Sequence, residues 1–529
     1  MKFALVLGIF ISQPIAAQES TVISSVLSVP VAESGNSKVI DSKNLNHNNI
    51  GSSSIPTYDY LISNSKKQYL WFDDSGLTMS GLSLHRLLAD LGWHQQIKVT
   101  SIEAESFKAH DEVLTLGFLK LLNLNESSSQ ENLSDGLLEA IDNDSTDELL
   151  LSLIPNYDQI SHLRKAISQY RFLSSYQWPK LDPSFKPKLG QSHKNVAAIR
   201  NILVNLGDLP KKAQTQYRLD VYDSVVVAAL KKFQERHGLT VDGKLGPQTY
   251  RALSVTPKQR VVQLQTNLWR WFTLPKEAPE NYLLVNIPGY QLAVVEGGEQ
   301  VMQMKVIVGD NDNQTPQMIT EINRVTLNPT WTPTPNIIKN ELIPEFEQDY
   351  LSLKRKNFQL VKGYWKNAQT REIDDPNLNL AKLLKSYRLV QAPGDNNALG
   401  YYRFNIPNDY SVYLHDTPIK SLFNRSERAL SHGCIRLEDA KLLANYLINS
   451  ETSVKPEKVN KALQSGKTTN LPLNNPLPVY ITYQTAWINE QGELRLSPDI
   501  YNLDHNNSSN SQFHATDSNP VISISQNNF

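Results

Sequence analysis

The spacing of apolar residues changes its period near Leu274, and this change limits the folds available to the chain. Before Leu274, apolar residues recur at intervals of three and four, as in residues 84–91, which predicts helices. After Leu274, short apolar runs such as 282–287 and 291–295 predict strands, and Pro288-Gly289 between them predicts a hairpin turn. Helices and strands segregated in this way indicate an α+β multidomain protein. The length of 529 residues allows about three or four domains.

The helical part of the chain divides into a scaffold and a smaller unit. Helical patterns over residues 56–192 predict the scaffold, and a further pattern over 255–275 predicts its return. The polar, acidic stretch from Asn125 to Asp147 is expected to be a loop within it. Residues 193–254 predict a small bundle of three helices, whose turns are marked by glycines and by Asp242-Gly243.

The strand part, residues 276–500, is expected to form one mostly-β domain. Residues 336–391 turn helical and polar, as an insertion between strands would. A helix is predicted over 437–449 and a closing strand over 479–487. The last segment, 501–529, has no Lys or Arg and is rich in Asn and Ser, which predicts a disordered tail.

The N-terminus resembles an export signal. Lys2 precedes an apolar stretch, and Ala16-Ala17 supply small residues for cleavage, so residues 1–17 are expected to be a signal peptide. Residues 18–55 are rich in Ser and Asn, which predicts a flexible tether. The chain has no apolar run of 18 residues, so no conventional membrane span is expected after cleavage.

Charge and cysteine content exclude several classes of function. Fifty-two Lys and Arg residues oppose 53 Asp and Glu residues, so the chain lacks the basic balance typical of nucleic-acid binding. One cysteine, Cys434, excludes an intramolecular disulfide framework and any cysteine-rich metal site. A single thiol in an exported protein is unusual, because oxidising compartments normally pair thiols. Cys434 is therefore expected to have a chemical role.

The surroundings of Cys434 supply the groups that a nucleophilic thiol needs. Cys434 lies in the run Ser431-His432-Gly433-Cys434-Ile435-Arg436, and Tyr413-Leu414-His415-Asp416 ends a strand upstream. Histidine is the usual base near neutral pH, so His415 or His432 could deprotonate the thiol. The period of two places Tyr413 and His415 on one strand face. Cys434 is expected to precede a helix directly, whose amides and dipole would stabilise a thiolate and a developing oxyanion.

These residues resemble the YkuD-type L,D-transpeptidases. The spaced His415, the Ser-His-Gly-Cys run and Arg436 carry the resemblance, and Asn328-Pro329-Thr330-Trp331 before the insertion resembles the large YcbB subfamily. The bundle at 193–254 resembles the peptidoglycan-binding type 1 module. The resemblance implies a mostly-β catalytic domain with a helical lid over about 336–391. It also implies that the protein is located in the periplasm of a Gram-negative bacterium, or at its inner membrane if the signal is not cleaved.

The resemblance implies a role for each residue of the site. Cys434 would attack the amide after the third residue of a peptidoglycan stem, releasing D-Ala, and an amine of a second stem would resolve the thioester into a 3→3 cross-link. His415 would be the general base. The amides of Gly433 and Cys434, with Tyr413 or Tyr402, would stabilise the oxyanion, and Arg436 would bind a substrate carboxylate. His432, beside Ser431, would have a structural role or donate a hydrogen bond. Asp416 would orient His415, and Trp331 would pack at the root of the lid. No cofactor is implied, and the expected partners are stem peptides and glycan, with other wall-synthesis enzymes possible.

Other interpretations of the same residues stay open. His415, His432 and Cys434 could bind zinc, although their spacing lacks the usual close pairing of ligands. Cys434 could be a buried structural thiol. Water instead of an amine could resolve the thioester, giving an L,D-carboxypeptidase. The protein could also bind the wall without catalysis, through the module at 193–254.

Overall fold

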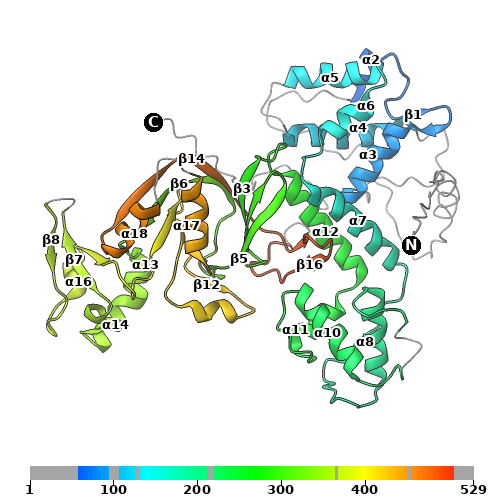
Figure 1. Cartoon of the computed structure of the whole chain (residues 1–529). Coiled ribbons are helices and arrows are strands. Elements are labelled where there is room, and N and C mark those ends of the chain that lie inside the picture. Colours follow the sequence, from blue (N-terminus) through cyan, green and yellow to red (C-terminus); the bar gives the residue numbers. More distant parts are fainter. Residues whose placement is uncertain are drawn as a thin grey trace, which may run out of the picture. The chain divides into compact units, whose positions relative to one another are not determined.

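The computed structural model describes residues 58–93, 107–125, 130–212, 218–363, 367–450 and 456–504 (Figure 1). The predicted signal peptide, the predicted tether and residues 505–529 lie outside these ranges. Within them, no helix is both long and apolar enough to cross a bilayer. The α+β fold class predicted from the sequence is confirmed, with helices before Leu274 and a large mixed sheet after it.

The scaffold consists of helices that share one apolar core with the return helix α12. Leu163 and Ile167 of α7 pack in the same core as Leu264 and Leu268 of α12. A side-chain and backbone capping box at Thr256 and a proline at the first turn begin α12. The scaffold elements are α2 (Tyr58–Asn64), β1 (Phe72–Asp73), β2 (Gly76–Leu77), α3 (Met79–Asp90), α4 (Phe107–Asn125), α5 (Gln130–Asp142), α6 (Thr146–Ser152), α7 (Asp158–Leu173) and α12 (Pro257–Phe272).

Helix α5 contradicts the loop predicted between Asn125 and Asp147. The stretch is polar on average, but Leu137 and Ile141 are fully buried in the scaffold core. Residues four apart lie on one helix face, so a few apolar side chains at this spacing are enough to anchor a helix that composition alone suggests is a loop.

The small bundle contains α8 (Lys194–Asn205), α10 (Ser224–Arg236) and α11 (Pro247–Ser254) around a core of its own. Asp223 caps α10 by accepting a hydrogen bond from the Val226 amide, and Pro247 begins α11. Gly238 has a φ of +62°, which is the left-handed conformation predicted after α10. Arg236 and Asp208 form a buried bidentate ion pair beneath it.

The strand-rich part of the chain is built on a nine-stranded mixed sheet in the order β12-β5-β13-β11-β10-β6-β14-β3-β4. Strand β4 also pairs with β5, so the sheet closes on itself. One sheet face carries the apolar core, which helix α17 (Ala440–Asn449) covers through Leu443 and Leu447. The strands are β3 (Asn281–Asn286), β4 (Gln291–Glu296), β5 (Glu299–Gly309), β6 (Met318–Leu327), β10 (Tyr402–Asn405), β11 (Leu414–His415), β12 (Ala429–Ser431), β13 (Ile435–Leu437) and β14 (Thr469–Thr482); a 3-10 helix (Lys420–Asn424) and α18 (Pro456–Gln464) lie between them.

The insertion between β6 and β10 folds around its own apolar core, so it is a small subdomain. The sequence predicted only helices here, but the structure adds a three-stranded sheet in the order β8-β7-β9. Phe358 and Leu360 alternate with polar residues in β7, a period of two that the polar surroundings obscure. Its elements are α13 (Pro335–Ile337), a π-helix (Ile338–Leu342), α14 (Ile343–Gln348), α15 (Ser352–Arg355), β7 (Phe358–Lys362), β8 (Gln369–Arg371), α16 (Leu380–Leu383) and β9 (Arg388–Gln391).

The C-terminal segment differs from two predictions. The predicted closing strand at 479–487 is the end of β14 followed by a separate strand, β15 (Ala486–Ile488), which pairs with β16 (Leu494–Leu496). The predicted disordered tail begins too early, because Tyr501 is buried in the core of the nine-stranded sheet and Asp504 forms an ion pair with Arg270 of α12.

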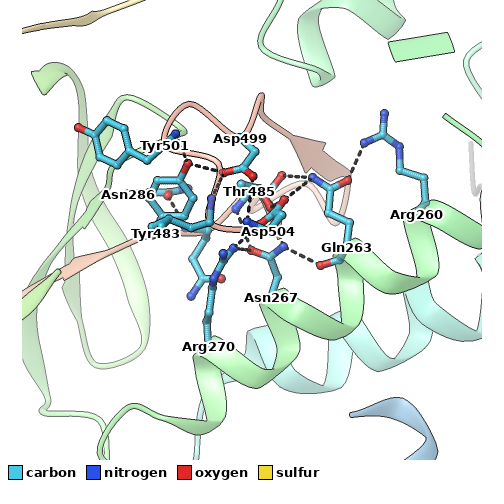
Figure 2. Close-up of polar contacts among 12 residues, drawn as sticks. Arg260, Gln263, Asn267, Arg270, Asn286, Tyr483, Thr485, Asp499, Tyr501 and Asp504 are labelled. Atoms are coloured by element: carbon cyan, nitrogen blue, oxygen red, sulfur yellow. Dashed lines mark hydrogen bonds and ion pairs between the residues drawn. The ribbon is translucent and has the colours of Figure 1, made fainter. Parts of the chain in front are cut away.

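Figure 2 shows how this segment joins α12 to the strand-rich domain. Asn267 accepts a hydrogen bond of 2.8 Å from the Thr485 amide, and Thr485 donates one of 2.8 Å to Asp504. Asp499 accepts a hydrogen bond of 2.6 Å from the Tyr483 hydroxyl, which in turn accepts one from the Tyr501 amide. A continuous set of polar contacts therefore runs from the scaffold to Tyr501.

Candidate active site

Cys434 lies in a tight connection between two strands. Ser431 ends β12 and Ile435 begins β13, while α17 begins only at Ala440. The prediction that Cys434 directly precedes a helix is therefore wrong, and no helix N-terminus stabilises its thiolate. The apolar run that suggested a helix from residue 437 begins with Leu437, which belongs to β13.

Strand pairing brings His415 beside the segment that carries Cys434. Strands β11 and β13 are parallel, with Leu414 opposite Ile435 and His415 opposite Arg436. Leu414 and Ile435 point into the apolar core. Because side chains alternate along a strand, Tyr413, His415, Cys434 and Arg436 share the opposite face. The structure thus gathers four of the predicted site residues on one polar face of the sheet.

The environment of His415 sets both its charge and its tautomer. The ring is 5% exposed, and burial, reinforced by the nearby Arg436, lowers the pKa of His415 to about 3. Its Nδ1 lies 2.5 Å from the carbonyl oxygen of Asp416, and only a protonated Nδ1 can donate there. The neutral ring therefore keeps its lone pair on Nε2, as a proton acceptor needs.

The thiol is also held in its neutral form. Burial raises the pKa of Cys434, and this effect exceeds the opposing ones of Tyr413 and Arg436. Burial, followed by the nearby thiol, also raises the pKa of Tyr413, which keeps its hydroxyl protonated as a donor. The resting site is thus a neutral thiol and a neutral imidazole. The thiol therefore has to pass its proton to the imidazole as it attacks a substrate.

The loop before Cys434 is fixed by hydroxyl groups. Ser431 Oγ donates to the Cys434 carbonyl at 2.6 Å and accepts from the Gly433 amide at 3.2 Å. The prediction that the Gly433 amide is an oxyanion donor is therefore wrong for this conformation, because that amide is already paired. Gly433 has a φ of +103°, which a side chain would strain. The Cys434 amide and the Tyr413 hydroxyl remain as donors beside the thiol.

Two other predicted site residues lie away from this face. Tyr402 belongs to the apolar core with Phe404, so its predicted contribution to an oxyanion hole is wrong. Its neighbour Arg403 takes the polar face instead, because side chains alternate along β10. The Asp416 carboxylate binds Lys420 and the Tyr401 amide, so Asp416 contacts His415 only through its backbone carbonyl.

The insertion reaches the site at two points. His432 Nε2 lies 2.6 Å from Glu341 Oε1 in the π-helix. Trp331 packs against Phe358 with ring centroids 5.9 Å apart. Trp331 also lowers the pKa of Tyr413, although burial, the larger effect, raises it. The predicted packing role of Trp331 at the root of the insertion agrees with this placement. Glu341 lacked any sequence signal, because it is one acidic residue in a polar stretch.

A cavity of about 390 Å³ opens beside the nucleophile loop. The loop after β5 forms one of its walls, and Thr315 there donates a hydrogen bond of 2.8 Å to the Gly433 carbonyl. Tyr501 holds the same loop, because its hydroxyl donates to the Gly309 carbonyl and accepts from the Thr315 amide. The cavity is lined by Asn313, Gln314, Thr315, Pro316, Gln317, Tyr410, Val412, His432, Gly433, Tyr483, Tyr501 and Leu503. The sequence did not single out Thr315 or Tyr501, because neither lies near a motif.

The zinc interpretation finds no geometric support in the described ranges. No group of three or more His, Cys, Asp or Glu side chains in them is arranged to hold a metal ion. His415 and His432 instead turn to different partners, the Asp416 carbonyl and Glu341.

Two segments of the chain match known protein families. Residues 280–459 match the L,D-transpeptidase catalytic domain family YkuD, and residues 192–253 match the family described as "Putative peptidoglycan binding domain". A curated protein of Haemophilus influenzae, "Putative L,D-transpeptidase", is 37% identical over 224 residues, which are 42% of this chain and 45% of that protein. The match thus spans less than half the length of that relative.

Two solved structures are also similar. An L,D-transpeptidase from Mycobacterium smegmatis has 14% sequence identity over 39% of this chain and 60% of its own, with a TM-score of 0.19. Another from Xylanimonas cellulosilytica has 14% identity over 57% of this chain and 99% of its own, with a TM-score of 0.19. On the two family matches, the chain carries a YkuD-type L,D-transpeptidase catalytic domain and a peptidoglycan-binding type 1 domain.

Proposed function

We propose that this protein is a peptidoglycan L,D-transpeptidase that forms 3→3 cross-links between stem peptides. The observation that supports this function most directly is the shared sheet face of Cys434, His415 and Tyr413, with the His415 lone pair on Nε2. A thiol, a neutral base and a hydroxyl donor on adjacent strands are the groups that acyl transfer requires.

The proposed reaction has two acyl transfers. Cys434 Sγ attacks the carbonyl carbon of the third stem residue while its proton passes to His415 Nε2. The C–N bond to D-Ala then breaks, and the imidazolium returns the proton to the leaving amine, which leaves a thioester. The amine of a second stem attacks the thioester and gives a proton to His415 Nε2. The C–S bond breaks, and His415 returns this proton to the Cys434 sulfur, which restores the thiol. The Cys434 amide and the Tyr413 hydroxyl would stabilise the oxyanion of both tetrahedral intermediates.

The remaining parts fit a substrate that belongs to the cell wall. The domain at 192–253 would hold peptidoglycan, and the insertion at 335–391 would cover the stem peptide during the reaction. The stem peptides lie outside the cytoplasmic membrane, so this proposal includes export to the periplasm.

Mass spectrometry of the products tests the proposal. The purified protein is incubated with a disaccharide-tetrapeptide, and a dimer that has lost one D-Ala is the expected product. Cys434→Ala should yield none, whereas the exposed-site control Ser426→Ala should behave as wild type. A tripeptide without dimer would indicate an L,D-carboxypeptidase. No conversion by a folded protein would contradict both the transpeptidase and the carboxypeptidase activity.

A further inference from the structure

Three arginines share the polar sheet face with Cys434, and two of them, Arg403 and Arg324, belong to no motif that the sequence singled out. Arg403 pairs directly with His415 across β10 and β11, and Arg436 pairs with His415 from the other side. Neighbouring strands lie ~4.8 Å apart, so Arg403 and Arg436 bracket His415 at about 10 Å from backbone to backbone. Arg324 follows on β6, the next strand of the sheet.

The orientation of these side chains follows from the core residues beside them. Arg403 lies between Tyr402 and Phe404, and both neighbours are buried in the apolar core. Arg324 precedes Val325, which is also in the core. Both arginines therefore point to the face of His415 and Cys434. The guanidinium of Arg403 lies 5.4 Å from the centre of the Tyr413 ring.

These arginines lack the partners that buried arginines have elsewhere in the described chain. Arg236 and Arg270 pair with carboxylates, and Arg428 binds carbonyl oxygens. In contrast, the Nε atoms of Arg324, Arg403 and Arg436 are buried without a hydrogen bond, and no ion pair within the described ranges involves these three residues. The nearest acidic influence is Glu341, which acts on Arg436.

An unpartnered cluster of like charges is costly, and a protein retains one where a ligand supplies the counter-charge. Burial is the main cause of the lowered pKa of Arg403, and the neighbouring Arg324 lowers it further. A planar guanidinium is suited to a carboxylate, which it can bind with two parallel hydrogen bonds.

We propose that Arg403 and Arg324 form a carboxylate-binding subsite next to the nucleophile, which recognises a free carboxylate of the donor peptide. The inference rests on the proposed function and deepens it by naming a substrate feature. Two carboxylates have the required chemistry: the terminal carboxylate of the residue that leaves, and the side-chain carboxylate of a third residue such as diaminopimelate.

The test compares donor peptides that carry free or amidated carboxylates. Wild-type protein should prefer the free acid, and Arg403→Gln should raise KM for it by about 10- to 100-fold, because hydrogen bonds to charged groups are of this strength. The variant should lose the preference between acid and amide, and Arg403→Lys should restore part of it. Amidation of only the terminal or only the side-chain group identifies which carboxylate binds. Equal acid-to-amide ratios of kcat/KM in wild type and variant would overturn the subsite.

A binding measurement separates this inference from the proposed reaction. Calorimetric titration of Cys434→Ala with the two peptides requires no turnover, and Arg403→Gln or Arg324→Gln in that background should abolish the preference for the acid. Absence of such a preference in Cys434→Ala itself would contradict the subsite, whether or not wild type is active. The exposed Arg218→Gln serves as control. If the arginine had only a structural role, its substitution would lower Tm. Removal of an unpaired buried charge should instead leave Tm equal or raise it.

Discussion

Thr315 donates a hydrogen bond of 2.8 Å to the carbonyl oxygen of Gly433, the residue before Cys434. This bond joins two segments 118 residues apart in sequence. It fixes the peptide plane between Gly433 and Cys434, whose amide is a proposed oxyanion donor. The orientation of that amide thus depends on a loop outside the catalytic motif.

Thr315→Val removes the bond to the Gly433 carbonyl and also the bond that Thr315 Oγ1 accepts from the Gly309 amide. It should lower kcat by about five- to tenfold with little change in KM, because the bond that positions Gly433 contributes about 1 kcal/mol. Thr315→Ser keeps the hydroxyl and should retain most of the activity. Steady-state kinetics on a soluble stem peptide measures both. A valine variant with wild-type kcat would show that the loop does not need this bond.

Tyr501 supports the same loop from the C-terminal segment. Tyr501→Phe removes the donor to the Gly309 carbonyl and the acceptor for the Thr315 amide, while the ring remains in the core. Because each buried hydrogen bond contributes about 1 kcal/mol, unfolding should become easier by about 1–3 kcal/mol. Urea denaturation measures this change. The variant should also lower kcat, as Thr315→Val does. A variant with wild-type stability and full activity would show that Tyr501 does not support this loop.

The contact between Glu341 and His432 should hold the insertion against the nucleophile loop. Glu341→Ala should therefore increase the rate at which a thiol reagent labels Cys434. Cys434 is the single cysteine of the chain, so labelling followed by intact mass spectrometry is unambiguous. Glu345→Ala is the matched control, because it removes an ion pair with Lys356 inside the insertion and leaves His432 untouched. Equal labelling rates in the two variants would show that the contact between Glu341 and His432 does not hold the insertion against this loop.

The buried His415 predicts a loss of stability in acid. Its pKa is about 3 in the folded protein and about 6.5 in an unfolded chain, so the unfolded state binds more protons between these values. The stabilising contribution is complete above pH 6.5 and declines as the pH falls toward 3.

His415→Asn should flatten the fall of Tm between pH 6.5 and 4, measured by scanning calorimetry. The flattening should be partial, because His237 in the small bundle is also buried with a lowered pKa. His162, which lies on the exposed face of α7, provides the control variant. Parallel pH profiles for wild type and His415→Asn would rule out this contribution.

The ion pair between Asp208 and Arg236 predicts a large effect in the small bundle. Both hydrogen bonds are 2.6 Å long and the Asp208 side chain is 1% exposed. Asp208→Ala leaves the guanidinium buried without its partner, so the bundle should lose about 3–5 kcal/mol of stability. Urea denaturation followed by far-ultraviolet circular dichroism measures it. The double variant Asp208→Ala, Arg236→Met should recover much of the loss, and an equally unstable double variant would argue against charge burial as the cause.

Local patterns in the sequence were enough to predict several features of this protein. The period of apolar residues predicted helices before Leu274 and strands after it. Glycine and proline positions predicted the turns and helix starts of the small bundle, because these residues act through backbone geometry at their own position. The alternation along one short strand predicted that Tyr413 and His415 share a face. The motif around Cys434 pointed to the family that the comparisons support.

Other features could not be predicted from local patterns, because they depend on which segments meet in space. Alternation fixes the face on which a side chain lies but not the partner strand, so the bracketing of His415 by Arg403 and Arg436 appears only with the pairing of β10, β11 and β13. The same limit applies to Thr315, which binds the Gly433 carbonyl from a distant part of the chain, and to Tyr501, which binds the Thr315 amide.

The sequence by itself determined the change of period near Leu274, the turns of the small bundle and the candidate site residues around Cys434, since these are properties of neighbouring residues. The tertiary structure decided that Tyr402 is core and Arg403 faces the site, that the Gly433 amide is occupied, and that Glu341 meets His432. Strand register and packing between distant segments set these relationships, because a shift of one residue along a strand exchanges its two faces.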